Sequence, residues 1–219
     1  MERLAKKIAE SIGESLGKTD EDVAVVAYGL IGILQFLAIF LLASTIGFAF
    51  SFWTEVVVVF LSVGFLRRLT GGAHSKGIYS CLVYSVCGVC GIAALACYVI
   101  PRIPFQVNCI CVAAIFIFGY IMIALKAPVA PPNKPCRSEA KRKRLRRGSF
   151  TVLSCYLALI ASCFVFKAMG THEQIGATLY SASLALAMST MWQILMMTRF
   201  GHGFIAFFDG LFTKKSRNH

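Results

Sequence analysis

The chain has 219 residues, of which 58% are hydrophobic and only 15% are charged, and its formal net charge is +12. Soluble domains carry about a quarter charged residues, so this composition, with a mean hydropathy of +0.73, excludes an ordinary soluble globular protein and predicts a membrane protein. The positive charge comes without a nucleic-acid-binding motif, so we expect no nucleic-acid partner and instead expect attraction to anionic lipid.

The first 20 residues predict a helix that lies on the membrane surface. Leu4, Ile8, Ile12 and Leu16 recur every four residues, and charged side chains occupy the opposite face of such a helix. We therefore expect residues 1–20 to form an amphipathic interfacial helix on the inner leaflet.

Six apolar segments follow, and each has the length that a membrane-spanning helix needs, about 20 residues. They cover residues 23–45, 48–66, 78–100, 103–125, 150–166 and 175–197. The first two form one run over 23–66 that is interrupted only by Glu55, so we expect a hairpin with its turn near 47–53. The sequence predicts a single all-α, polytopic membrane domain over 1–219 with about six transmembrane helices.

The basic residues predict the orientation of these helices. If the N-terminus is cytoplasmic, 20 of the 22 Lys and Arg residues fall on the inner side, and only Arg102 and Lys167 fall outside. Lys and Arg are retained on the cytoplasmic side of membrane proteins, so we expect both termini in the cytoplasm. The inner segments would then be the loops 67–77 and 126–148 and the tail 198–219, which flank the helix pairs over 23–66, 78–125 and 150–197.

A polar stretch between the second and third spans, TGGAHSKGIYSC over residues 70–81, holds the strongest candidate site. His74 and Cys81 are the residue types that a cysteine acyl-transfer site needs, a base and a thiolate nucleophile. Cys81 stands near the start of the third predicted helix, where the helix dipole favours an anion. His74 would act as base toward the thiol and later as acid toward the leaving amine.

Distance shows that this stretch cannot be one continuous helix. Seven residues at about 1.5 Å each would hold His74 and Cys81 about 10 Å apart along the axis, whereas a hydrogen bond needs about 3 Å. We therefore expect a bend between residues 72 and 80, with Gly77 as the residue best able to allow it. Gly71 and the glycine after it would let the backbone turn just before His74.

The stretch RRLTGGAHSKGIYSC resembles the signature of the accessory gene regulator protein B (AgrB) family: an Arg, a Gly pair, then His and Cys seven residues apart. The stretch KAPVAPPNKP resembles the second block of that family, a proline-containing loop after the fourth helix, and the likeness covers essentially the whole chain. It implies a multi-pass cysteine endopeptidase of the bacterial cytoplasmic membrane, with Cys81 as nucleophile, His74 as general base and the site facing the cytoplasm. Four further residues are expected to shape the loop or position the substrate: Arg67, Gly71, Gly72 and Gly77.

The same resemblance implies a substrate, a short AgrD-like precursor peptide with an amphipathic N-terminus, an internal Cys or Ser and an acidic tail. The enzyme would remove that tail through an acyl-enzyme, and the internal Cys or Ser would close the thiolactone or lactone ring of a quorum-sensing pheromone. The resemblance is compatible with a homodimer, and it implies neither a cofactor nor a metal.

A second candidate site is a basic run in the predicted inner loop 126–148. Its members are Lys141, Arg142, Lys143, Arg144, Arg146 and Arg147. Such a run is typical of a topology signal that also contacts anionic lipid. The alternative is that it binds the acidic tail of the substrate, an attraction that salt would screen.

Three alternatives stay open from the residues alone. No Asp or Glu lies in the loop to orient His74, and Asp209 is an alternative that no pattern supports, so we expect a dyad. A non-catalytic small transporter or lipid-binding scaffold would use the basic run instead. A thiol-redox protein would use Cys87 and Cys90, although the membrane context lacks the βαβ unit typical of that motif.

Overall fold

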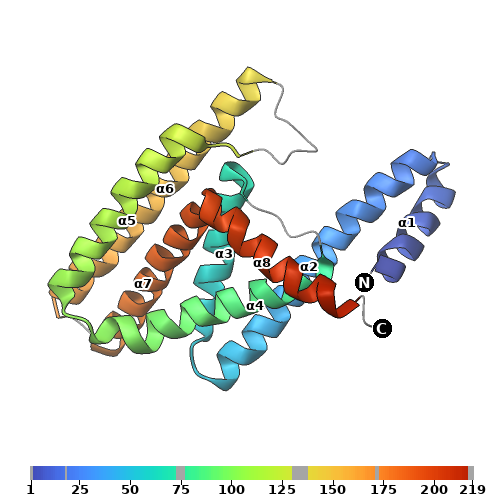
Figure 1. Ribbon diagram of the computed structural model, residues 1–219. Helices are drawn as coiled ribbons and strands as arrows, with labels where there is room; N and C mark the ends of the chain where they lie inside the picture. The colour runs from blue at the N-terminus through green and yellow to red at the C-terminus, as the bar shows by residue number, and fades with distance from the viewer. Residues whose placement is uncertain (1, 18, 73–76, 130–137, 171–172, 217–219) are drawn as a thin grey trace.

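The computed structural model is built from helices (Figure 1). It describes residues 2–17, 19–72, 77–129, 138–170 and 173–216, and no strand occurs within these ranges. The elements are, in order, α1 (Glu2–Leu16), α2 (Asp20–Ala49), α3 (Trp53–Thr70), α4 (Ile78–Ala94), η1 (Leu95–Val99), η2 (Ile100–Arg102), α5 (Phe105–Lys126), α6 (Glu139–Ala168), α7 (Glu173–Met196) and α8 (Arg199–Ser216).

Five helical stretches in the described ranges are long and apolar enough to cross a membrane. They are α2, the continuous stretch Tyr79–Arg102, α5, α6 and α7. The sixth predicted span, α3, is a helix of 18 residues that also carries Glu55, Arg67 and Arg68. The predicted all-α, multi-pass fold with an N-terminal helix is confirmed, and the side of the membrane that the termini face stays a prediction.

Glu55, the acidic residue of α3, is buried in protein rather than exposed to lipid. Glu55 is 4% exposed, and its Oε1 accepts a hydrogen bond of 2.5 Å from the Ser181 hydroxyl of α7. A charge or polar group within a membrane helix is costly unless the bundle interior supplies a partner. The turn between α2 and α3 falls at residues 50–52, inside the predicted range 47–53.

Three predicted boundaries differ from the structure. The basic run predicted as part of the loop 126–148 forms the first turns of α6, because Lys and Arg are good helix formers and the Ser138 hydroxyl caps the helix by accepting from the Lys141 N–H. The loop predicted at 67–77 begins later, because α3 continues to Thr70. The tail predicted at 198–219 contains the 18-residue helix α8.

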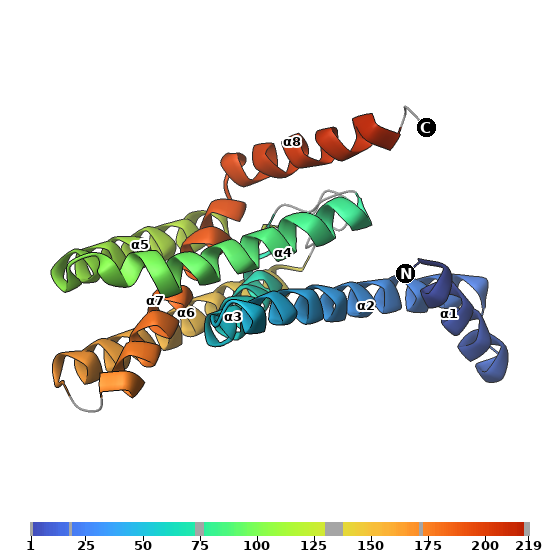
Figure 2. The ribbon, with the colours of Figure 1, turned by 90° about the horizontal axis from the view of Figure 1, so that it is seen from below.

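α7 lies at the centre of the bundle and α2 at its edge. The most apolar window of α7 is 67% buried, whereas that of α2 is 0% buried. α7 packs against α3 and α6 along its length and also contacts α4, α5 and α8. Figures 1 and 2 show α2 extending away from the other spans, with α1 folded against its first turns.

The end of α4 departs from regular α-helix at a proline. Pro101 has no N–H to continue the ladder, and the preceding turn widens so that the Ile100 N–H donates to the carbonyl of Leu95, five residues back. The Asn108 amide on α5 donates to the Ile100 carbonyl at 3.1 Å and to the Tyr180 hydroxyl of α7 at 2.8 Å. These contacts join η2, α5 and α7 at the end of the bundle remote from Cys81.

Candidate functional site

Cys81 lies in the first turn of α4 and is half-buried. Its backbone N–H donates to the Gly77 carbonyl at 3.0 Å, and its side chain packs beside Tyr84, Met196 and Ile205. Gly77 has an extended backbone, with φ −100° and ψ 134°, and α4 begins only after it. The helix that carries Cys81 is therefore interrupted at the predicted residue, whereas His74 lies in the stretch 73–76, outside the described residues.

The backbone before His74 is held by Val129, which lies in the second sequence block, KAPVAPPNKP. Gly71 forms an isolated parallel bridge with Val129, and the Val129 N–H donates to the Thr70 carbonyl at 2.8 Å. Gly71 has φ +71°, and a Cβ atom there would collide with the Val129 carbonyl oxygen. Only glycine fits this close backbone approach, so the two stretches that carry the family resemblance meet in space.

A buried glutamine on α7 also holds the backbone at Thr70 and Gly71. We call these contacts of Gly71 with Val129 and Gln193 the backbone anchor. The Gln193 side chain is fully buried, and its Nε2 donates to the Thr70 hydroxyl at 2.9 Å and to the Gly71 carbonyl at 2.8 Å. Its Oε1 has no hydrogen-bond partner in the described part of the chain. Gly72 follows at φ +141° and approaches the Met196 carbonyl. Sequence reasoning missed Gln193, although a glutamine inside an apolar span is a usable signal.

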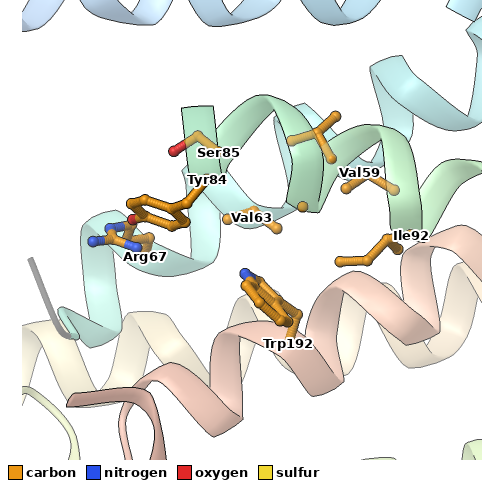
Figure 3. Close-up of a pocket in the computed structure, with 9 residues that line it drawn as sticks. Val59, Val63, Arg67, Tyr84, Ser85, Ile92 and Trp192 are labelled. Atoms are coloured by element: carbon orange, nitrogen blue, oxygen red, sulfur yellow. The ribbon is translucent and has the colours of Figure 1, made fainter. Parts of the chain in front are cut away.

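A cavity of about 50 Å³ lies between α3, α4 and α7 (Figure 3). It is lined by Val59, Val63, Arg67, Tyr84, Ser85, Gly88, Val89, Ile92 and Trp192. Arg67 and Tyr84 lie together at one end of the cavity. Ile92 of α4 and Trp192 of α7 form an apolar wall toward the other end. The Ser85 hydroxyl is 4.0 Å from the Cys81 sulfur, so the cavity is adjacent to the thiol.

The six side chains of the basic run are not equivalent. Five of them, all except Arg146, are exposed, and none of the six forms an ion pair with another described residue. Arg146 is half-buried, and its guanidinium donates to the Ala124 carbonyl near the end of α5. A cation at a helix C-terminus satisfies an orphan carbonyl and the negative end of the helix dipole. Arg146 therefore has a structural contact, whereas the other five side chains are exposed and form no ion pair with a described residue.

Ser80 and Asp209 lie outside the predicted loop 67–77 and meet beside Cys81. Asp209 lies on α8, and its carboxylate accepts a hydrogen bond from the Ser80 hydroxyl, next to Cys81. No pattern in the sequence connects Ser80 with Asp209, because 129 residues separate them.

The cysteines of the alternative redox site lie away from this contact. Cys87 and Cys90 lie farther along α4 as free thiols, and all eight described cysteines are unpaired.

The sequence model of the family described as accessory gene regulator B matches residues 5–197 of the chain. An AgrB-like protein of Clostridium perfringens strain SM101 is 27% identical over 217 residues, which cover 98% of this chain and 99% of that protein. A protein of strain 13, named AgrB-like protein 2, is 26% identical over the same shares. An AgrB-like protein of Halalkalibacterium halodurans is 26% identical over 159 residues, 73% of this chain and 76% of its own length. No solved structure matches the chain.

Proposed function

The chain belongs to the accessory gene regulator B family, and we propose that it is a membrane-embedded cysteine endopeptidase that removes the C-terminal tail of an AgrD-like precursor. Membership gives the chain a role in an accessory gene regulator system, in which the family processes peptides. The observation that carries the finer proposal is the position of Cys81, half-buried in the first turn of α4 and beside a cavity. On this proposal residues 1–219 form one peptidase domain that acts from the cytoplasmic side.

The first half of the proposed reaction breaks the peptide bond before the tail. Cys81 gives its proton to His74, and the resulting thiolate attacks the scissile carbonyl carbon and forms a tetrahedral intermediate. The carbon–nitrogen bond then breaks, and the tail leaves as an amine that takes a proton from the His74 imidazolium. The remainder of the precursor stays bound to Cys81 as a thioester.

The second half releases the product by ring closure. The internal Cys or Ser of the precursor loses its proton to His74 and attacks the thioester carbon. The Cys81 sulfur leaves as thiolate, and the precursor closes to a thiolactone or a lactone. Ring closure outcompetes hydrolysis when the internal nucleophile lies close to the thioester carbon and water is excluded.

The cavity beside Cys81 is suited to a small apolar side chain of the substrate near the scissile bond. Its walls are mainly valine, isoleucine and tryptophan, and Arg67 at one end supplies a cation for a carbonyl or carboxylate. Arg67 lies in the last turn of α3, so a helix rather than a loop holds it in place.

The direct test uses the purified protein in liposomes with a cognate precursor. Cys81→Ala and His74→Ala should each abolish tail release, and wild type should form a hydroxylamine-sensitive thioester seen by mass spectrometry. Cys87→Ala is the matched control, because Cys87 is an exposed free thiol on the same helix and should keep full activity. Tail release by both the Cys81 and the His74 variant would overturn the peptidase proposal and favour a non-catalytic transporter or scaffold.

The five exposed basic side chains of α6 are proposed to bind the acidic tail of the precursor. Changing all five to Gln should raise the KM for an acidic-tailed precursor several-fold at low salt, and the difference should shrink as added salt screens the charges. Arg102→Gln with Lys167→Gln is the control, since both residues lie near the opposite end of the bundle. An unchanged KM in the variant with all five residues changed would contradict binding of the acidic tail and leave lipid contact as the role of the run.

A further inference from the structure

We propose that Asp209 of α8 is a positioning residue that holds the first turn of α4, and with it Cys81, through the hydroxyl of Ser80. The Ser80 Oγ donates to the Asp209 Oδ1 at 2.7 Å. Ser80 directly precedes Cys81, so the carboxylate is attached to the backbone turn that carries the sulfur. The inference rests on the proposed function only for the role of Cys81 in cleavage.

The chemistry of the contact favours Asp209 as the acceptor for Ser80. Ser80 is 3% exposed, and a buried hydroxyl requires a hydrogen-bond partner. Its Oγ also lies 3.0 Å from the Gly77 carbonyl, which already accepts from the Cys81 N–H. A hydroxyl has one proton, and the shorter bond to an ionised carboxylate is the stronger of the two.

The first turn of α4 has no local side-chain cap. Gly77 is the N-cap residue, and it has no side chain to accept from the orphan N–H groups of the first turn. A carboxylate at a helix N-terminus interacts favourably with the helix dipole. Asp209 therefore supplies from a distant helix the negative charge that an Asp cap would supply locally.

α8 is fixed against the site by an apolar face. Ile205 is 3% exposed and clusters with Tyr84 and Met196, while Phe204 meets the Trp192 ring edge-on with centroids 5.5 Å apart. Figure 2 shows α8 lying alongside α4 and running in the opposite direction. These contacts hold Asp209 at the first turn of α4. α8 lies beyond residues 5–197, the part of the chain that the family model matches.

Positioning matters because a thiol misplaced by about 1 Å can cost about 100-fold in rate. Asp209→Ala and Ser80→Ala should each lower the kcat for tail release by about 10- to 100-fold while KM changes less than about twofold. Both changes remove the bond between Ser80 and Asp209, so the double variant should lose clearly less than the product of the two single losses. Asp209→Asn keeps an oxygen acceptor for Ser80 and should retain kcat within about threefold.

A measurement without substrate accompanies the kinetics. The rate at which iodoacetamide labels Cys81, followed by peptide mass spectrometry, should change in Asp209→Ala and return toward wild type in Asp209→Asn. Phe207→Ala is the control on α8, since this side chain is 64% exposed and should leave both readouts unchanged. If Asp209→Ala does not fold, Ser80→Ala carries the same test.

The outcomes separate this inference from the proposed function. If Cys81→Ala is inactive while Asp209→Ala and Ser80→Ala match wild type in kcat and labelling, the positioning role is refuted and the peptidase proposal stands. If Asp209→Asn is as impaired as Asp209→Ala, or if the double variant loses the product of the two single losses, the hydrogen-bond account is also refuted. If Cys81→Ala still releases the tail, the peptidase proposal fails, and the labelling rates alone decide the role of Asp209.

Discussion

The chain enters and leaves the stretch around His74 through two anchors of different kinds. Before it, Gly71 is held by backbone contacts with Val129 and by the Gln193 amide. After it, the first turn of α4 is held by a contact between two side chains, Ser80 and Asp209. The backbone anchor leaves no room for a Cβ atom, whereas the side-chain anchor needs only a suitable acceptor. The first should therefore be intolerant of substitution and the second tolerant of conservative change.

The largest expected effect comes from adding one methyl group to the backbone anchor. Gly71→Ala should abolish tail release, because the alanine must adopt φ +71° and its Cβ would meet the Val129 carbonyl. Gly170→Ala is the matched control: it has φ +67°, yet nothing lies within 4 Å of the added Cβ. It should lose about 1 kcal/mol of stability with little loss of activity. Equal activity in the two variants would show that tail release does not depend on the close approach of Gly71 to Val129.

An intermediate effect is expected from the amide that supports the same anchor. Gln193→Leu removes the hydrogen bonds to Thr70 and Gly71, and we expect a loss of about 1–3 kcal/mol in unfolding free energy with at least a tenfold fall in kcat. Gln174→Leu, an exposed position near the other end of α7, should change neither quantity. Thermal unfolding and tail release measure the two effects, and a Gln193→Leu protein with normal kcat would contradict the anchor.

The smallest effect is expected beside the side-chain anchor, in the cavity next to Cys81. Gly88→Ala places a Cβ 3.7 Å from the Trp192 ring, an ordinary contact that takes up cavity volume. We expect KM to rise about two- to fivefold with kcat unchanged, because the helix itself tolerates alanine better than glycine. Gly91→Ala, which meets nothing within 4 Å, is the control. The same KM in both variants would exclude the cavity as a substrate-binding pocket.

The sequence by itself predicted the long apolar helices, of which five in the described ranges are long and apolar enough to cross a membrane, and two of the places where helices stop. Long apolar runs predict spanning helices because hydrocarbon leaves no alternative to intrahelical hydrogen bonds. The hairpin turn near Trp53 and the helix break at Gly77 follow from length and distance, and both are present. The charge of the basic run is typical of an inner loop, but Lys and Arg are also good helix formers, and the run forms the first turns of α6.

Only the tertiary structure decided which faces meet. α2 is the most apolar span, with a mean hydropathy of 2.5, and is 0% buried, whereas α7 is the least apolar at 1.2 and is 67% buried. Hydropathy measures how well a side chain suits lipid, so it does not say which helices and side chains pack against one another. The polar residues of α7 are stable because the bundle supplies their partners, and Gln193 with Thr70 is such a pair across 123 residues of sequence. Tertiary packing likewise brings Asp209 to Ser80. Apolar contacts place α8 beside the start of α4, and no local sequence pattern predicts them.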